Sequence, residues 1–129
     1  MLAVDTNVVV RLLADDDPQQ SPSARRLFQQ HTIYLVKTVL LETEWVLRKT
    51  YACSRHEIHQ RLLTLVSLPQ VEVEQAHAVV HALAWFAQGM DFADALHLAT
   101  SDDCDAFATF DRKLAAAAKK AKAGKVKAL

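Results

Sequence analysis

The chain has 129 residues, of which 51% are hydrophobic and 23% charged, so it is long and apolar enough to bury the core of one globular domain. Its 15 basic and 15 acidic residues give a formal net charge of zero. The two cysteines, Cys53 and Cys104, form no CxxC motif, which argues against a zinc ribbon or a secreted disulfide scaffold and favours the reducing cytoplasm.

The first thirty residues predict a strand and two helices. An apolar run over residues 2–4 is typical of a short buried strand, and the apolar spacing over residues 7–14 predicts a helix. Ser21 and Pro22 are suited to the N-cap and the first position of a second helix. We expect that helix to end near residue 30.

The middle of the chain predicts one strand and two helices. Residues 33–36 form a second apolar run, and Thr38 is a candidate N-cap for a helix that continues to about Tyr51. The expected apolar face of that helix includes Leu41, Trp45 and the stem of Arg48. Ser54 and Glu57 have the spacing of a capping box, which predicts a further helix. Its expected apolar face consists of Ile58, Leu62, Leu65 and Val66.

The remainder predicts three strands and three helices. We expect strands at residues 71–73, 106–109 and 126–129, the last as an edge strand. A helix over residues 75–88 should end at Gly89 and bury Val79, Val80, Leu83, Phe86 and Ala87. Asp91 and Asp111 are candidate N-caps for helices over residues 92–101 and 112–121. Strands that alternate with helices predict a parallel α/β sheet in one domain.

The apolar segments do not indicate a membrane protein. Asp5 interrupts the first apolar run and no basic segment precedes it, unlike in a signal peptide. The longest uncharged stretch, Gln75 to Met90, is too short to span a bilayer and carries His77 and His81. We therefore expect a cytoplasmic protein without a membrane span.

Four acidic residues stand among apolar neighbours, where an isolated carboxylate is unfavourable: Asp5, Glu42, Asp94 and Asp111. Asp5 and Asp111 follow predicted strands at the carboxyl edge, where sites form in open α/β sheets. If those two strands are neighbours, the two acids meet. Four clustered carboxylates would repel one another unless a cation neutralised them, and oxygen ligands suit Mg²⁺ or Mn²⁺.

Each acid also has a structural explanation. Asp5 and Asp111 are plausible helix N-caps, and Asp94 lies in the first turn of its helix, where a negative charge is favourable. Glu42 is explained equally well as the polar side of a helix. The segment after Asp111 contains no acid and seven basic residues, which are suited either to phosphate contacts or to a solvated surface. Those residues are Arg112, Lys113, Lys119, Lys120, Lys122, Lys125 and Lys127.

Motifs around the four acids resemble those of PIN-domain nucleases. They are DTNVVVRLL, LLETEWVLRKTY, GMDFADALHLA and ATFDRKL, which follow one another in family order and cover essentially the whole chain. Within that family they most resemble the VapC-type toxins of prokaryotic toxin–antitoxin pairs. The resemblance implies a three-layer α/β/α fold whose central parallel sheet has four to five short strands.

The resemblance also assigns roles to residues. It maps the four acids onto the family's metal site, which implies one or two Mg²⁺ or Mn²⁺ ions. Thr6 and Asn7 follow the first acid in the family manner, and Thr109 matches a small hydroxyl residue two positions before the last acid. Asp91 is a common additional acid in such toxins, and its capping role explains it equally well.

For the second acid, the family pattern selects Glu42 rather than Glu44. The family acid is followed three residues later by Trp and then by Val-Leu, and this spacing fits Glu42 with Trp45. The Lys-rich C-terminus is less typical of the family.

The implied function is that of a toxin that hydrolyses RNA with the help of a metal ion and leaves a 5′-phosphate and a 3′-hydroxyl. Such toxins normally form homodimers and are blocked by a small VapB-type antitoxin. Basic residues that are candidates for phosphate contacts are Arg11, Arg48, Arg112 and Lys113. Trp45, Trp85, Phe86 and Phe92 are candidates for partner interfaces, although their spacing favours the core.

Other functions have weaker support. His77 and His81 share a helix face, but there is no HExxH motif and no third zinc ligand at a suitable spacing. No Walker A, GxGxxG or phosphoacceptor receiver pattern is present. The alternative that stays open is a PIN-fold module that binds RNA or a protein without cleaving it.

Overall fold

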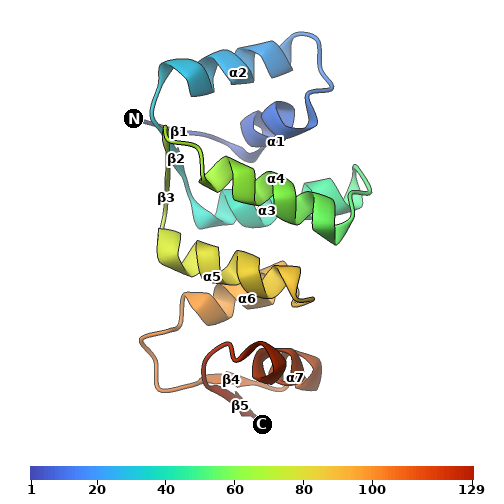
Figure 1. The fold of residues 1–129 in the computed structure, drawn as a ribbon, viewed down its shortest axis with the longest axis vertical. Coiled ribbons are helices and arrows are strands. Elements are labelled where there is room, and N and C mark those ends of the chain that lie inside the picture. The colour runs from blue at the N-terminus through green and yellow to red at the C-terminus, as the bar shows by residue number, and fades with distance from the viewer. The chain divides into compact units, whose positions relative to one another are not determined.

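The structure is a computed structural model that describes residues 1–129 as seven helices and five strands, with one or two helices between successive strands (Figure 1). The chain divides into two compact units, Met1–Glu74 (unit 1) and Gln75–Leu129 (unit 2). All strand pairs are parallel, so the predicted parallel α/β class is confirmed. None of the seven helices combines the length and the hydropathy that a membrane span requires.

Unit 1 contains a three-stranded parallel sheet in the order β1–β2–β3. The strands are β1 (Leu2–Ala3), β2 (Ile33–Leu35) and β3 (Val71–Val73). In the central strand Ile33 aligns with Leu2 on one side and with Val71 on the other. Ile33 and Leu35 are fully buried, as the second apolar run predicted. The prediction of a buried first strand is wrong, because Leu2 and Ala3 of β1 are exposed and only Val4 of that run is buried.

Helices α1 (Thr6–Ala14) and α2 (Gln20–Gln30) pack against each other in unit 1. Helix α2 begins one residue before Ser21, so the prediction that Ser21 is its N-cap is wrong. The buried Ser21 hydroxyl instead donates a 2.8 Å hydrogen bond to the carbonyl oxygen of Arg11. The start of α2 is stabilised by Asp17, whose Oδ1 accepts the backbone N–H groups of Gln19 at 2.9 Å and Gln20 at 2.7 Å.

Helix α3 (Lys37–Lys49) begins before Thr38, which is therefore not its N-cap. The first turn is held from outside the helix, because the backbone N–H of Lys37 donates to Glu74 Oε1 at 2.9 Å. The apolar face predicted around Trp45 is also wrong, since Trp45 is 53% exposed. The buried residues of α3 are Leu40, Thr43, Glu44 and Leu47.

Helix α4 (Arg55–Val66) packs against α3 and begins with the predicted capping box. Ser54 Oγ accepts the N–H of Glu57 at 3.1 Å, and the N–H of Ser54 donates to Glu57 Oε1 at 3.1 Å. Ile58, Leu62 and Leu65 are buried as predicted, whereas Val66 is only half-buried.

In unit 2, α5 (Ala76–Ala87) packs closely against α6 (Phe92–Ala99). The rings of Phe86 and Phe92 meet edge to face, with centroids 5.5 Å apart, so the core assignment of these two residues is confirmed. Gly89 follows α5 with φ +112°, a conformation that favours glycine, and the helix ends there as predicted. Val80 and Ala87 were expected in the apolar face but are exposed.

The C-terminal elements are β4 (Phe107–Thr109), α7 (Arg112–Ala121) and β5 (Val126–Ala128). The two strands pair in parallel, with Phe107 aligned with Val126 and Thr109 with Ala128. Helix α7 connects them and packs on both. The predicted final strand is confirmed, and the segment is anchored by the buried side chains of Leu114, Ala118 and Ala123.

Candidate metal site

Asp5 lies just after β1 and is the N-cap of α1. Its Oδ1 accepts the backbone N–H of Thr6 at 2.7 Å, and its side chain is exposed. The next side chain is unusual, because Thr6 is buried and its Oγ1 has no hydrogen-bond partner. An unsatisfied buried hydroxyl is unfavourable. The start of α1 therefore presents an exposed carboxylate beside an unused oxygen.

Glu42 is exposed on α3, as a side chain that binds a ligand needs to be. Glu44, two residues later, is buried and paired with Arg48, whose Nε lies 2.8 Å from Glu44 Oε2. Glu44 therefore has a structural partner, and Glu42 has none within hydrogen-bonding or ion-pairing distance. This difference is in line with the choice of Glu42 over Glu44.

The acids at the start of α6 form a local network. Asp91 is the predicted N-cap, and its Oδ2 accepts the backbone N–H of Asp94 at 3.1 Å. Partial burial raises the pKa of the half-buried Asp94 carboxyl, and the negative charges of Asp91 and Asp111 raise it further, while His97 opposes the shift. The electrostatic influence of Asp111 indicates that the predicted acids of unit 2 lie near enough to repel one another.

Asp111 lies two residues beyond β4 and is the predicted N-cap of α7. Its Oδ1 accepts the backbone N–H groups of Lys113 at 2.9 Å and Leu114 at 3.1 Å. Thr109 positions this residue, because its Oγ1 accepts the backbone N–H of Asp111 at 2.9 Å. The position of the last acid is thus fixed by hydrogen bonds on both sides.

The three capping acids, Asp5, Asp91 and Asp111, use their oxygens in the same way. In each, one carboxylate oxygen binds the helix backbone and the other has no hydrogen-bond partner. These free oxygens are hard ligands of the kind that Mg²⁺ and Mn²⁺ prefer. Asp5 and Glu42 belong to unit 1, and Asp94 and Asp111 belong to unit 2. Neither unit by itself brings three metal-binding side chains close enough to hold an ion.

The four candidate phosphate-binding residues differ in their surroundings. The side chain of Arg11 is hydrogen-bonded within unit 1, with Nε 2.7 Å from Gln20 Oε1 and Nη1 3.3 Å from the hydroxyl of Tyr51. Arg48 is occupied by Glu44. Arg112 and Lys113 are exposed and form no ion pair. No sequence pattern identifies the residues that hold Arg11, since they lie 9 and 40 positions away.

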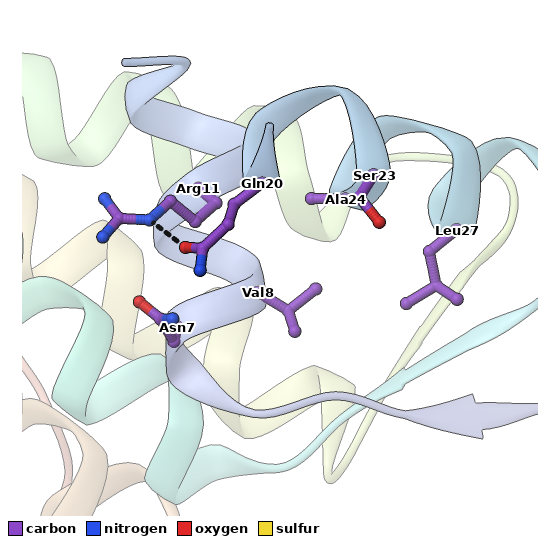
Figure 2. A pocket seen from close by; sticks show the side chains of 7 residues that line it. All are labelled: Asn7, Val8, Arg11, Gln20, Ser23, Ala24 and Leu27. Atoms are coloured by element: carbon purple, nitrogen blue, oxygen red, sulfur yellow. Dashed lines mark hydrogen bonds between the residues drawn. The ribbon is translucent and has the colours of Figure 1, made fainter. Parts of the chain in front are cut away.

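A pocket of about 250 Å³ opens between α1 and α2, close to the start of α1. Figure 2 shows Val8 and Leu27 facing the same space from the two helices, with Asn7 and the Arg11–Gln20 pair along its border. Because Asn7 is only two residues from Asp5, this pocket adjoins the helix end that carries the first acid.

The donor chemistry of the candidate residues fits a hard divalent cation. All four acids offer carboxylate oxygens. Burial is the main cause of the raised pKa of Asp94, and a cation would relieve the repulsion by Asp91 and Asp111 that adds to it. The unpartnered Thr6 hydroxyl adds a further oxygen beside Asp5.

Residues 2–120 match the family described as PIN domain. No individual curated protein matches the chain. Members of the family are usually nucleases that depend on divalent metal ions, so the match supports a nuclease-type hydrolase acting on RNA. Because the match covers nearly the whole chain, the protein belongs to the PIN-domain family.

Proposed function

We propose that this protein is a metal-dependent endoribonuclease that acts as the toxin of a VapC-type toxin–antitoxin pair. The observation that supports it best is that the free carboxylate oxygens occur at helix starts directly after strands, at Asp5 and Asp111. The raised pKa of Asp94 adds an electrostatic reason for a cation. The chain would act in the cytoplasm as a single PIN domain over residues 1–129.

In this proposal Asp5 is the central ligand of one or two Mg²⁺ or Mn²⁺ ions, and Asp94 and Asp111 complete the ligand set. Glu42 binds directly or through water. The metal, when bound, supplies positive charge to the scissile phosphate and makes a water molecule more acidic. Thr6 and Asn7 support the first acid, and the last two acids are positioned by Asp91 and Thr109, whose hydrogen bonds are described above.

Substrate and partners follow from the same proposal. The products are a 5′-phosphate and a 3′-hydroxyl, and Arg112 and Lys113 contact phosphates that flank the cleaved bond, with Arg11 and Arg48 in a lesser role. The active form is a homodimer, and a small antitoxin blocks it. The exposed Trp45 is suited to such an interface, because a large exposed aromatic side chain is stabilised when a partner covers it.

The first test is RNA cleavage by the purified chain in Mg²⁺ or Mn²⁺, with EDTA as a control. Asp5→Asn should abolish cleavage while keeping an N-cap, since Asn also caps helices. Asp103→Asn is the matched control, because Asp103 is an exposed acid without a hydrogen bond. Cleavage by Asp5→Asn at the wild-type rate would refute the metal site. RNA binding without cleavage by the wild type would favour the binding module.

A second test measures metal binding itself. Ligands that bind only the folded state raise stability by mass action, by about 1.4 kcal/mol when their concentration is ten times Kd. Mn²⁺ should therefore raise the Tm of the wild type and of Asp103→Asn, but not that of Asp5→Asn. The toxin role is tested separately: expression of the wild type in a bacterial host should arrest growth, and Asp5→Asn should not.

A further inference from the structure

In unit 2 the acidic and the basic residues occupy different parts of the chain. Its six acids all precede residue 112: they are Asp91, Asp94, Asp102, Asp103, Asp105 and Asp111. Its seven basic residues all follow, and we call them the C-terminal basic surface: Arg112, Lys113, Lys119, Lys120, Lys122, Lys125 and Lys127. All seven are exposed, and none forms an ion pair.

Unit 1 differs in this respect. Its ion pairs join Arg11 to Asp16, Arg25 to Asp15 and Arg48 to Glu44. In unit 2 no acidic side chain neutralises the basic ones through direct contact. The positive charge of the C-terminal basic surface is therefore available to a ligand.

The surface is carried by folded elements. Leu114, Ala118 and Ala123 are buried beneath it, and β5 is hydrogen-bonded to β4. Within α7, residues seven positions apart lie on the same face, so Arg112 is aligned with Lys119 and Lys113 with Lys120. An ordered array of cations loses less conformational entropy on binding than a flexible tail does.

A stabilising effect on α7 or β5 accounts for only some of the residues in the C-terminal basic surface. Lys119 and Lys120 are favourable in the last turn of α7, and Lys127 discourages pairing along an edge strand. Arg112 and Lys113 have the opposite relation to the helix, because cations are unfavourable in the first turn. Lys122 is the C-cap of α7, where a cation is again favourable, whereas Lys125 lies in the connection between α7 and β5 and has no such role. Arg112, Lys113 and Lys125 thus point to a ligand with several negative charges.

A cleft adjoins the same residues. Lys122 and Lys125 line a cavity of about 580 Å³ in unit 2, together with His81, Trp85 and Phe107 and with the acids Asp102 and Asp105. The rings of His81 and Trp85 are stacked, with centroids 6.0 Å apart and planes at 24°. Cations beside an aromatic wall are typical of proteins that bind single-stranded nucleic acid, in which phosphates contact the cations and bases stack on the rings.

We propose that the C-terminal basic surface binds the phosphate backbone of single-stranded RNA, with a base held in the cleft beside Trp85. The surface begins at Arg112, directly after the proposed metal ligand Asp111, so the bound strand continues from the site of cleavage. This inference deepens the proposed function and rests on it only in taking RNA as the substrate. Binding is measured in EDTA, which makes it independent of catalysis.

The experiment compares two variants that each remove two positive charges. Lys120→Gln/Lys125→Gln changes the C-terminal basic surface, and Arg26→Gln/Lys49→Gln changes exposed, unpaired residues of unit 1. Affinity for a fluorescent single-stranded RNA is measured from 0.05 to 0.3 M KCl. Each lost phosphate contact should reduce the slope of log K against log salt by about 0.7, or about 5-fold in affinity at 0.1 M salt. The first variant should thus bind about 25-fold more weakly, and the second should bind like the wild type.

Lys120→Arg/Lys125→Arg keeps the charges and should bind like the wild type, which separates lost contacts from a damaged fold. Equal slopes for both Gln variants would overturn the proposal, as would equal weakening by the Gln and Arg variants of the surface. If the RNA binds as expected but is never cleaved in Mg²⁺ or Mn²⁺, the surface stands and the nuclease proposal fails.

The choice of single-stranded RNA has its own test. Trp85→Leu should weaken binding of the single strand by on the order of 10-fold, because it removes one stacking contact. Leu63→Ala, a change of an exposed apolar side chain of unit 1, should have no effect on RNA binding. Unaltered affinity of Trp85→Leu, or tighter binding of duplex than of single-stranded RNA by the wild type, would overturn the assignment of the cleft.

Discussion

Glu44 and Arg48 form an ion pair across one turn of α3, with Arg48 Nε 2.8 Å from Glu44 Oε2. The two partners differ in environment, because the Glu44 side chain is 3% exposed and that of Arg48 is 42% exposed. Water can solvate the arginine if the pair is broken, but it cannot reach the glutamate. The pair therefore stabilises the fold mainly by compensating a buried negative charge.

Arg48→Met should consequently destabilise the protein more than Glu44→Met does. The first change leaves an unpaired buried carboxylate and should lower the free energy of unfolding by about 2–3 kcal/mol, which is less than for a fully buried pair because Arg48 is partly solvated. Urea unfolding of both single variants and the double variant measures the coupling. Glu42→Gln is the control and should unfold like the wild type. A larger loss in Glu44→Met would contradict this account.

The orientation of α3 predicts opposite effects for two of its large side chains. Leu47 is fully buried, whereas Trp45 is 53% exposed. Leu47→Ala should destabilise the protein by about 2–5 kcal/mol, because it removes packed atoms and leaves a cavity. Trp45→Gln should change stability by less than about 0.5 kcal/mol. Thermal unfolding at one pH compares the two variants. A larger loss of stability in Trp45→Gln than in Leu47→Ala would support the apolar face that the sequence predicted, with Trp45 buried.

Asp17 should make stability dependent on pH. Hydrogen bonds from the backbone N–H groups of Gln20 and Gln19 lower the pKa of its carboxyl below the ordinary 3.8. The ionised form thus stabilises the folded state above pH 3.8, and this contribution is lost as the pH falls through the lowered pKa. Asp17→Ala should be less stable than the wild type at pH 7, and the difference should shrink in acid. Asp103→Ala should show no difference in urea midpoint at either pH.

Asp94 should contribute a pH dependence of stability that is opposite in sign to that of Asp17. Its pKa is raised by burial and by Asp91 and Asp111, so the folded state holds the Asp94 proton more tightly than the unfolded chain does. Stability is therefore lost as the pH rises through the raised pKa, and the charged form destabilises the fold at pH 7. Asp94→Asn should raise the Tm in EDTA at pH 7 and abolish its increase with Mn²⁺. Asp103→Asn is the matched control, and a Tm of Asp94→Asn no higher than that of the wild type would contradict crowding of the acids.

The sequence predicted best those features that depend on neighbouring residues. The capping box at Ser54 and the caps at Asp91 and Asp111 each need only a side chain and the next helical turn. Features that depend on distant residues were predicted less well. Two apolar faces are compatible with the spacing of α3, and the ion pair of Glu44 allows the face that contains it to be buried. Likewise, Ser21 had the residue type of an N-cap, but Asp17 supplies the stronger acceptor.

The same distinction applies to the candidate site. The residue types and spacing identified the four acids, and the hydrogen bonds at Asp5 and Asp111 follow from their places before helices. The sequence did not reveal that the Thr6 hydroxyl has no partner or that Arg11 is held by Gln20 and Tyr51. Those contacts arise from packing between segments that are not adjacent in the chain.

The capping acids couple metal binding to the dynamics of individual peptide groups. In Asp111 one oxygen holds the amide protons of Lys113 and Leu114 while the other is free for a cation. Fraying of the first turn of α7 would let the carboxylate rotate away, so an ion bound to it must oppose fraying. Protection of these amides against hydrogen exchange would then rise with Mn²⁺ concentration, and the Thr6 amide beside Asp5 would respond in parallel. The exchange rate of each of these amide protons would thereby measure how much of the metal site is occupied.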